Sequence, residues 1–362
     1  MISIKRIIII LAVIILPILC ISCGTSQVEI EPTTIPDEIN SVPSAYAWSK
    51  NNDQEETSIY ALDQNHVWAT SGSRITFFDG SSWNEQTEIE GIDISGIFVV
   101  SDENAWISGY TRPFGGAIYH FDGSSWEEQY SQEDSYFEAI TAVDPEHVWA
   151  VGNNSYNFSP GAIYFYDGSI WGKQYELDNN YQIFDICAVD TDHVWAAVTY
   201  NETGPGYVKG SGPGYVYFYD GSSWVQQFET ETGNGKISEL LGIYALDESH
   251  VWAAGRESGD GILMNQIYFY NGSKWEKQYE VEGTHGLWSI CACDENHVWA
   301  TGGSEIFFYN GSSWEKQYFI EETPGGGFGS TASIFNGISA SDIDNVWAVS
   351  GSGIYYGKRQ SE

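Results

Sequence analysis

The 362-residue sequence predicts an all-β fold, a seven-bladed β-propeller of four-stranded antiparallel blades. Two half-repeats carry this prediction. The first, of the type Asp-x-x-His-Val-Trp-Ala, occurs seven times, and the second, of the type Tyr-Phe-Tyr-Asp-Gly-Ser-Ser-Trp, occurs six times complete. They recur about every 45 residues, the spacing of a blade that cannot bury both faces alone and therefore stacks in a ring. The tryptophans of the first half-repeat are Trp68, Trp106, Trp149, Trp195, Trp252, Trp299 and Trp347.

Each unit is expected to supply four strands in a fixed order, as the third unit illustrates. The first, at 140–144, begins with isoleucine and continues with a small residue two positions on, which places bulk and then room on one face. The second, at 147–150, follows a turn in which His147 is of a type that tolerates a left-handed backbone. The third, at 163–166, is rich in aromatic residues that favour strands. An Asp-Gly hairpin signal then leads to Trp171, which opens the fourth strand.

The seventh unit is divided between the two ends of the chain. It stops after its third strand, near Tyr356, and its missing fourth strand is expected at 44–50, which contains Trp48. We expect residues 44–50 to pair beside Tyr355 and to close the ring, because closure removes an exposed sheet edge. Fourteen of the fifteen tryptophans then belong to the repeat, and Trp288 lies outside it.

The second half-repeat resembles a known repeat. The aromatic strand, the Asp-Gly-Ser-Ser-Trp turn and the strand after it resemble the Asp-box (BNR) repeat of sialidase-like propellers, as in the segment 308–314. The units differ from that pattern by having one residue fewer between Asp and Trp, and by using Asn at positions 271 and 310. The resemblance implies a blade with this turn between its outer two strands, and it implies no activity, because Asp-box turns are structural.

The amino-terminal segment predicts export. Residues 1–22 have a basic start and a short apolar stretch, as in a signal peptide. A small residue before Cys23 is similar to a bacterial lipoprotein cleavage site, so we expect lipidation at Cys23, with a simple secretory signal or an uncleaved anchor as alternatives. The polar segment 23–43 is expected to be a flexible tether, and 44–362 the propeller. The protein is therefore expected outside the cytoplasm, anchored to a membrane at the cell surface or the periplasmic face.

The composition restricts the partners. The formal net charge of −36 disfavours nucleic acid and anionic lipid head groups as partners of the ring. The charge serves solubility, edge protection or a saline habitat, or it provides a docking surface for cations or a basic partner. We expect Cys187, Cys291 and Cys293 to be free thiols in a monomeric ring without a cofactor. No metal site is expected, because the template histidines are distributed one per unit: His66, His147, His193, His250 and His297.

The loops of the units differ on one side. The loops between the second and third strands, and those joining each unit to the next, vary in length and composition, whereas the other turns hardly change. Both variable sets emerge on the same face of an antiparallel blade, so this variable face is expected to bind something. The loops between second and third strands carry aromatic and arginine residues suited to an interface, among them Tyr110, Arg112, Tyr200 and Arg256.

A second candidate site lies at the mouth of the central channel. The residue six positions before the turn residue that ends the first strand differs in every unit, and the next residue is small except at Asp185. These mouth positions are Thr57, Ser95, Glu138, Phe184, Leu241, Trp288 and Asn336. We expect a ligand site made of Trp288, His285, Asp185, Phe184 and Glu138.

Three functions remain in view. The first is a non-catalytic, membrane-anchored propeller that binds a protein or a glycan through its variable face. The second is a glycan hydrolase or lyase in which Glu138 and Asp185 form an acid and base pair. A sialidase is disfavoured because Arg74, Arg112 and Arg256 are dispersed over three units. The third is a structural scaffold in an envelope complex.

Overall fold

The computed structural model describes residues 44–154, 160–200, 212–232, 236–320 and 334–360. All of them belong to one of the two units into which the chain divides, Pro43–Glu362. The predicted signal peptide, the tether and Cys23 lie outside the described residues. No helix among the described residues is long and apolar enough to cross a membrane.

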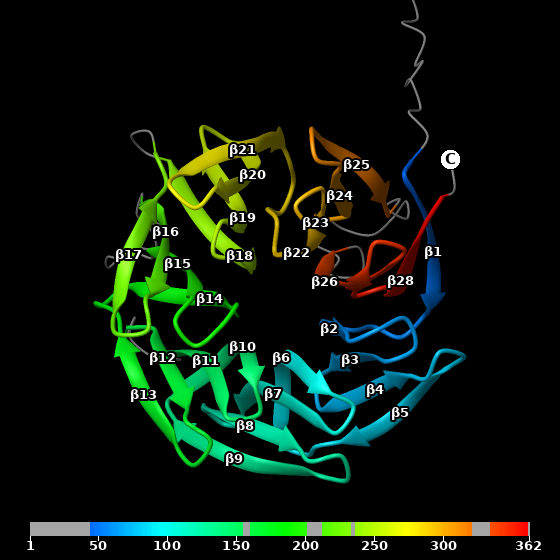
Figure 1. Ribbon diagram of the computed structural model, residues 1–362, viewed down its shortest axis with the longest axis vertical. Coiled ribbons are helices and arrows are strands. Elements are labelled where there is room, and N and C mark those ends of the chain that lie inside the picture. The colour runs from blue at the N-terminus through cyan, green and yellow to red at the C-terminus, as the bar shows by residue number, and fades with distance from the viewer. Residues whose placement is uncertain (1–43, 155–159, 201–211, 233–235, 321–333, 361–362) are drawn as a thin grey trace, which may run out of the picture. The chain divides into compact units, whose positions relative to one another are not determined.

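The described residues form seven four-stranded antiparallel sheets around a central axis, which confirms the predicted seven-bladed propeller (Figure 1). Blades 1 to 3 consist of β2 (Ser58–Ala61), β3 (Val67–Ser71), β4 (Arg74–Phe78) and β5 (Trp83–Glu88); β6 (Ile92–Ser101), β7 (Asn104–Thr111), β8 (Gly115–Phe121) and β9 (Trp126–Glu133); β10 (Ser135–Asp144), β11 (His147–Asn154), β12 (Ala162–Tyr166) and β13 (Trp171–Glu176). Blades 4 and 5 consist of β14 (Tyr181–Ala188), β15 (Val194–Tyr200), β16 (Gly214–Tyr219) and β17 (Trp224–Glu229); β18 (Ile237–Asp247), β19 (His250–Gly259), β20 (Ile262–Tyr270) and β21 (Trp275–Glu282). Blades 6 and 7 consist of β22 (Ser289–Asp294), β23 (His297–Gly302), β24 (Glu305–Tyr309) and β25 (Trp314–Phe319); β26 (Phe335–Asp342), β27 (Asn345–Ser350), β28 (Gly353–Arg359) and β1 (Tyr46–Asn52).

Blade 7 contains strands from both ends of the chain, as the sequence predicts. Strand β1 pairs antiparallel with β28, and Lys50 lies opposite Tyr355. Tyr46 anchors the joint, because its ring packs edge-on against Trp299 of blade 6 and its hydroxyl donates a hydrogen bond of 2.7 Å to the Ile343 carbonyl. Residues more than 300 positions apart in the chain are thereby joined in one sheet, at the right of Figure 1.

The hydrophobic core is divided among the interfaces between blades. Each second-strand tryptophan is buried, and its ring packs with apolar side chains of a neighbouring blade. Trp149 of blade 3, for example, shares a cluster with Ile183 and Ile186 of blade 4. The isoleucine that opens each first-strand repeat is buried as well, at Ile59, Ile97, Ile140, Ile186, Ile243, Ile290 and Ile338. The repeated residues therefore stabilise the stacking of blades, which leaves the non-repeated residues for other roles.

A glutamine three residues after the fourth-strand tryptophan links adjacent blades. Gln227 of blade 4 accepts hydrogen bonds from Trp195 of the same blade (3.1 Å) and from Trp275 of blade 5 (2.9 Å). Gln174 does the same for Trp149 and Trp224. The sequence carries this signal as a Trp-x-x-Gln pattern, which recurs at Gln86, Gln129, Gln174, Gln227, Gln278 and Gln317. We call this arrangement the glutamine latch.

In six blades the turn after the first strand is held by its aspartate rather than by a left-handed residue, and blade 2 has Ser101 at this position. Asp144 accepts hydrogen bonds from the backbone N–H of Glu146 (2.8 Å) and His147 (3.0 Å), and the His147 ring lies within 2.9 Å of its carboxylate. Partial burial alone would raise the pKa of Asp144, but the hydrogen bonds have the larger combined effect, so the pKa of Asp144 lies below its usual value. The expectation of a left-handed histidine is wrong: the left-handed non-glycine residues in the described ranges are Asp134, Asn180 and Asp260, all in variable loops.

The Asp-Gly turns form as predicted. Gly80 has a φ of 86°, which glycine adopts without strain, and the Asp79 carboxylate accepts the backbone N–H of Ser81 and Ser82 at 2.9 Å each. The Ser81 hydroxyl donates to the same carboxylate at 2.6 Å, and this bond together with the two backbone N–H bonds lowers the pKa of Asp79 to about 2. The three cysteines of the ring are free thiols, also as predicted.

A buried carboxyl at the joint predicts a pH-dependent stability. Glu56 is 1% exposed, and burial raises its pKa to about 7 although Arg74 and Thr76 oppose the shift. Because the folded state holds the proton more tightly, stability is lost as pH rises from the unfolded pKa of about 4.3 toward 7. Between pH 5 and 7 Glu56 is therefore expected to cost the wild type on the order of 2 kcal/mol of unfolding free energy, and the Glu56→Gln variant is expected not to show this fall. Chemical denaturation at several pH values measures this slope.

The neighbouring exposed residue provides the control. Glu55→Gln, which removes the same charge next to Glu56, is expected to leave the slope of stability against pH unchanged. Equal slopes for the two variants would contradict the assignment to Glu56.

Candidate binding funnel at the channel mouth

The variable loops lie at one end of every blade. In blade 3 the start of β10 pairs with the end of β11, Ser135 opposite Asn154, and the start of β12 pairs with the end of β13, Ala162 opposite Glu176. The loops between second and third strands and those between blades therefore share one face of the ring. The innermost strands β2, β6, β10, β14, β18, β22 and β26 also begin at this face, around the axis (Figure 1).

The mouth positions are bulged residues in five of the seven blades. In β10 the register passes from Phe137 to Ala139 and leaves Glu138 without a partner on β11. A bulge inserts an extra residue and redirects its side chain, here away from the ladder. The other bulged residues are Ser95, Phe184, Leu241 and Asn336. In blades 1 and 6 the mouth residue precedes the strand, and Thr57 and Trp288 donate their N–H to the carbonyls of Thr70 (2.7 Å) and Thr301 (2.8 Å).

The small residue after each bulge permits the innermost strands to approach one another. A Cβ added to Gly242 would lie 2.8 Å from the carbonyl oxygen of Trp288, and one added to Gly96 would lie 3.1 Å from Cα of Ala139. Asp185 occupies the same position in blade 4 and bridges instead: its carboxylate accepts the N–H of Ile186 and that of Ile243 in blade 5, each at 2.8 Å. Asp185 is thus an acceptor for backbone groups between two blades.

The mouth residues of all seven blades line one cavity of about 420 Å³, which we call the funnel. Followed around the ring, the mouth side chains form one continuous apolar run and one continuous polar run. Blades 4, 5 and 6 present an apolar arc of Phe184, Leu241 and Trp288. Blades 7, 1, 2 and 3 present a polar arc of Asn336, Thr57, Ser95 and Glu138. The funnel therefore has two chemically different halves although every blade follows one template.

Glu138 is the acidic member of the polar arc. The Tyr110 hydroxyl donates a hydrogen bond to it, and the Tyr110 ring stacks on Tyr136 with centroids 4.5 Å apart. Burial raises the pKa of Glu138 to about 7, and the hydrogen bond from Tyr110 opposes the shift. Near neutral pH this carboxyl therefore exists in both protonation states and both donates and accepts hydrogen bonds.

Trp288, in the apolar arc, is held by a charged cluster on blade 5. The Arg256 guanidinium lies 5.6 Å from the Trp288 ring centroid, pairs with the Glu239 carboxylate and donates a hydrogen bond of 3.0 Å to the His285 carbonyl. Trp288 remains 37% exposed. His285 thus contributes its backbone to this support, while its side chain bonds to Thr284 and is not part of the funnel lining. The register pairs Glu239 opposite Arg256, a contact that the sequence pattern did not reveal.

The remaining candidates lie apart from the funnel. Arg112 pairs with Asp93 at 3.0 Å and borders a separate hollow of about 760 Å³ on blade 2, together with Phe114. Tyr200 packs against Tyr181 with centroids 5.0 Å apart. The structure therefore brings together Trp288, Asp185, Phe184, Glu138 and Tyr110, with Arg256 behind them.

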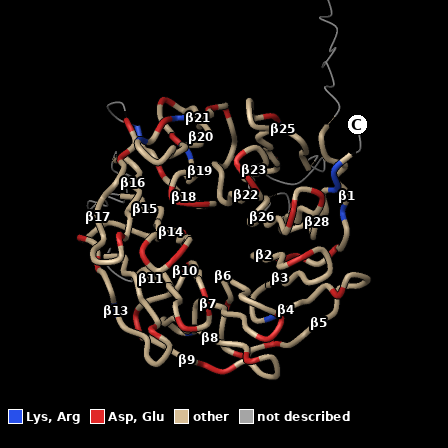
Figure 2. Tube along the Cα trace, in the orientation of Figure 1, with Lys and Arg blue, Asp and Glu red and all other residues tan. Residues whose placement is uncertain are grey.

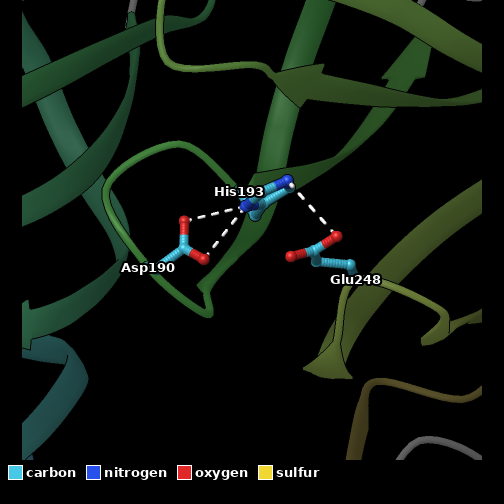
Figure 3. A group of neighbouring side chains, drawn as sticks. All are labelled: Asp190, His193 and Glu248. Carbon is cyan, nitrogen blue, oxygen red and sulfur yellow. Dashed lines mark hydrogen bonds and ion pairs between the residues drawn. The ribbon is translucent and has the colours of Figure 1, made fainter.

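One group of side chains on the opposite face has the composition of a metal site (Figure 3). His193 Nδ1 lies 2.9 Å from Asp190, and its Nε2 lies 3.8 Å from Glu248 of blade 5. Because Asp190 is on the Nδ1 side, an ion at Nε2 would have two protein ligands, fewer than a zinc site uses. The same contact recurs between His250 and Glu295, at 3.4 Å. The arrangement is therefore a contact between blades that is charged when the histidine is protonated, and it forms where the next blade carries an acidic residue directly after its turn residue.

The fold and the funnel together define a seven-bladed β-propeller with an asymmetric axial pocket. No protein-family model matches the chain, and a search of curated proteins found no match. Solved structures do match it. YCF48 bound to D1 peptide is 16% identical, with a TM-score of 0.59 over 88% of this chain and 97% of that one. A streptogramin B lyase is 15% identical, with a TM-score of 0.60 over 87% of this chain and 98% of that one.

A third similar structure is the GH74 xyloglucanase from Xanthomonas campestris, which is 12% identical, with a TM-score of 0.55 over 87% of this chain and 54% of that one. At these identities the likenesses establish the fold alone, and the resemblance to Asp-box repeats stays a prediction. A peptide complex, a lyase and a glycanase share the architecture, so the function has to be argued from the funnel.

Proposed function

We propose that this protein is a non-catalytic binding propeller, held outside the cytoplasm by a lipid at Cys23, and that it recognises a protein or a glycan at the funnel on its variable face. One observation carries the proposal. The one innermost-strand position that differs in every repeat supplies the lining of a single cavity, whereas the uniform positions stabilise the blades. Convergent polar groups beside apolar side chains in a concave site are typical of ligand pockets.

The state of the carboxyl groups favours binding over hydrolysis. Glycoside hydrolysis commonly uses two carboxyl groups, one on each side of the scissile bond. The funnel lining contains two, Glu138 and Asp185, and both oxygens of Asp185 accept backbone N–H groups. Asp185 therefore serves the contact between blades 4 and 5, and Glu138 is left without a second free carboxyl as its partner.

The charge of the ring supports a neutral or basic partner. Asp and Glu outnumber Lys and Arg by 50 to 14, and acidic positions occur on every side of the ring (Figure 2). Anionic polymers would be repelled before they reached the funnel. The predicted signal peptide at residues 1–22 supports a partner outside the cytoplasm, such as a component of the cell envelope or an extracellular polymer.

The test compares one funnel variant with one variant of the opposite face. The double change Trp288→Ala, Asn336→Ala removes one side chain from each arc, and Glu248→Gln alters an exposed residue on the other face. The immobilised full chain is exposed to fractionated envelope proteins and glycans, and retained species are identified by mass spectrometry. The proposal is supported by a species that the wild type and Glu248→Gln both retain and that the funnel variant binds at least about tenfold more weakly.

The opposite result is equally defined. If every retained species binds the funnel variant as strongly as the wild type, the funnel is not the recognition site. If nothing is retained by the wild type, the binding function is wrong and a scaffold role is favoured.

A further inference from the structure

We infer that the ligand of the funnel is a neutral sugar ring, stacked on the apolar arc and hydrogen-bonded by the polar arc. The inference rests on the proposed function and names the chemical class that the two arcs fit. A pyranose has C–H groups on its faces and hydroxyl groups around its edge, so it requires an apolar surface on one side and donors and acceptors on the other.

The apolar arc offers a fixed aromatic platform. Trp288 is the exposed tryptophan outside the repeat, and Arg256 packs over its ring while Glu239 and the His285 carbonyl hold the guanidinium. An immobilised ring loses little conformational entropy when a ligand stacks on it. Leu241 and Phe184 extend the same apolar surface along blades 5 and 4.

The polar arc retains hydrogen-bonding capacity for hydroxyl groups. Asn336 is exposed in the funnel lining, and its side-chain amide, which has two donors and one acceptor, forms no hydrogen bond with the described residues. The hydroxyls of Thr57 and Ser95 donate to the carbonyls of Thr70 (2.9 Å) and Phe137 (2.5 Å), which leaves their oxygens free to accept. Glu138 adds a carboxyl oriented by Tyr110. Hydroxyl, amide and carboxyl groups match the alternating donors and acceptors of a sugar edge.

Charge selects a neutral sugar over an anionic one. A sugar carboxylate, sulfate or phosphate would enter a cavity whose lining contains Glu138 and Asp185 and no basic residue. Burial raises the pKa of both carboxyl groups to about 7, so their ionised fraction repels an anionic group in this partly desolvated site, and the repulsion grows as the pH rises. Sialic and uronic acids are therefore expected to bind more weakly than neutral sugars at and above neutral pH.

A basic peptide side chain is the principal competitor. Arg256 already places a positive charge over the Trp288 ring, which disfavours a second cation in the same pocket. Glu138 is a weak anchor for a cation, since its carboxyl is partly protonated near neutral pH. The cavity of about 420 Å³ is near the lower end of small-molecule pockets, which span roughly 300–1,000 Å³, and so suits one or two sugar rings.

The experiment measures binding of four neutral disaccharides, cellobiose, maltose, lactose and N,N′-diacetylchitobiose, to the full chain by saturation-transfer NMR and calorimetry. The full chain, which is expected to carry a lipid, is kept in a zwitterionic detergent, because a detergent with a sugar head group would compete with the disaccharides. We expect saturable binding of at least one disaccharide below about 10 mM, weakened at least about tenfold by Trp288→Ala. Phe319→Ala, which removes an exposed aromatic residue that does not line the funnel, is expected to leave binding unchanged.

A second variant separates a sugar from a cation. Glu138→Gln preserves a hydrogen-bonding side chain and removes the charge, so it is expected to weaken disaccharide binding by less than Trp288→Ala does, whereas a cation would lose its carboxylate anchor. The inference would be overturned by a lysine-terminated peptide that binds the wild type, competes with no sugar, and no longer binds the Glu138→Gln variant. Thermal unfolding of each variant, compared with the wild type, confirms that the ring is folded.

The failures of the inference and of the proposed function are distinguishable. If no disaccharide binds but the Trp288→Ala, Asn336→Ala chain loses a partner retained by the wild type, the sugar is wrong and the binding function stands. If neither disaccharides nor envelope species depend on Trp288 and Asn336, both are wrong.

Discussion

Trp149→Ala is expected to lower the free energy of unfolding by about 3–5 kcal/mol, the cost of emptying a large aromatic site in a packed core. Trp149 is 1% exposed and packs with Ile183 and Ile186 of blade 4. Its indole N–H also donates to Gln174, whose carbonyl would keep only the hydrogen bond from Trp224. Denaturant unfolding followed by circular dichroism measures the change. The loss combines buried apolar area, a residual cavity and one hydrogen bond.

The matched control is the tryptophan outside the repeat. Trp288→Ala removes the same side chain from the edge of the funnel, and its stability is expected to remain within about 0.5 kcal/mol of the wild type. Losses of similar size in Trp149→Ala and Trp288→Ala would contradict the division between structural and ligand-facing tryptophans.

Removal of strand β1 is expected to lower the midpoint of thermal unfolding by on the order of 10 °C and to cause self-association. Without residues 44–52, β28 becomes an unpaired edge, and Trp299 and Phe308 lose the Tyr46 ring that packs on them. An exposed edge offers its free N–H and C=O groups to another chain. Light scattering during size-exclusion chromatography reports the association, and scanning calorimetry reports the midpoint.

A shorter truncation controls for the loss of the preceding segment. A chain that lacks residues 1–43 keeps β1 and is expected to remain monomeric with an unchanged midpoint. If the chain that lacks residues 1–52 is equally stable and monomeric, β1 does not stabilise the ring.

The blades were predictable because the repeat provides its own internal comparison. Positions that are uniform among seven units, such as the second-strand tryptophans, have one structural role that a period of about 45 residues reveals. The same comparison found the mouth positions, since Glu138 and Trp288 occupy equivalent places and differ in chemistry. Closure by residues 44–50 followed from counting strands in the last unit, and pairing with Tyr355 confirms it.

The parts that sequence reasoning missed depend on backbone geometry or on contacts between units. The bulge at Glu138 shifts the alternation of buried residues by one position, from Phe137 to Ile140, and such a single shift does not by itself identify a bulge in the sequence. The support of Trp288 by Arg256 joins blades 5 and 6, and His285 contributes a carbonyl, which any residue could supply. The Trp-x-x-Gln pattern was visible, but its role appears only when Gln227 is seen between two indoles.

The glutamine latch is incomplete where the two ends of the chain meet. Gln317 accepts a hydrogen bond from Ser44 instead of an indole, and the Trp48 N–H has no hydrogen-bond partner among the described residues, as is also the case for Trp171 in blade 3. Asn51 accepts the Trp83 N–H, a role that a longer glutamine has in four other blades. During synthesis β1 leaves the ribosome first and β28 last, so blade 7 waits unfinished until translation ends. This joint is thus the last contact between strands to form on the nascent chain.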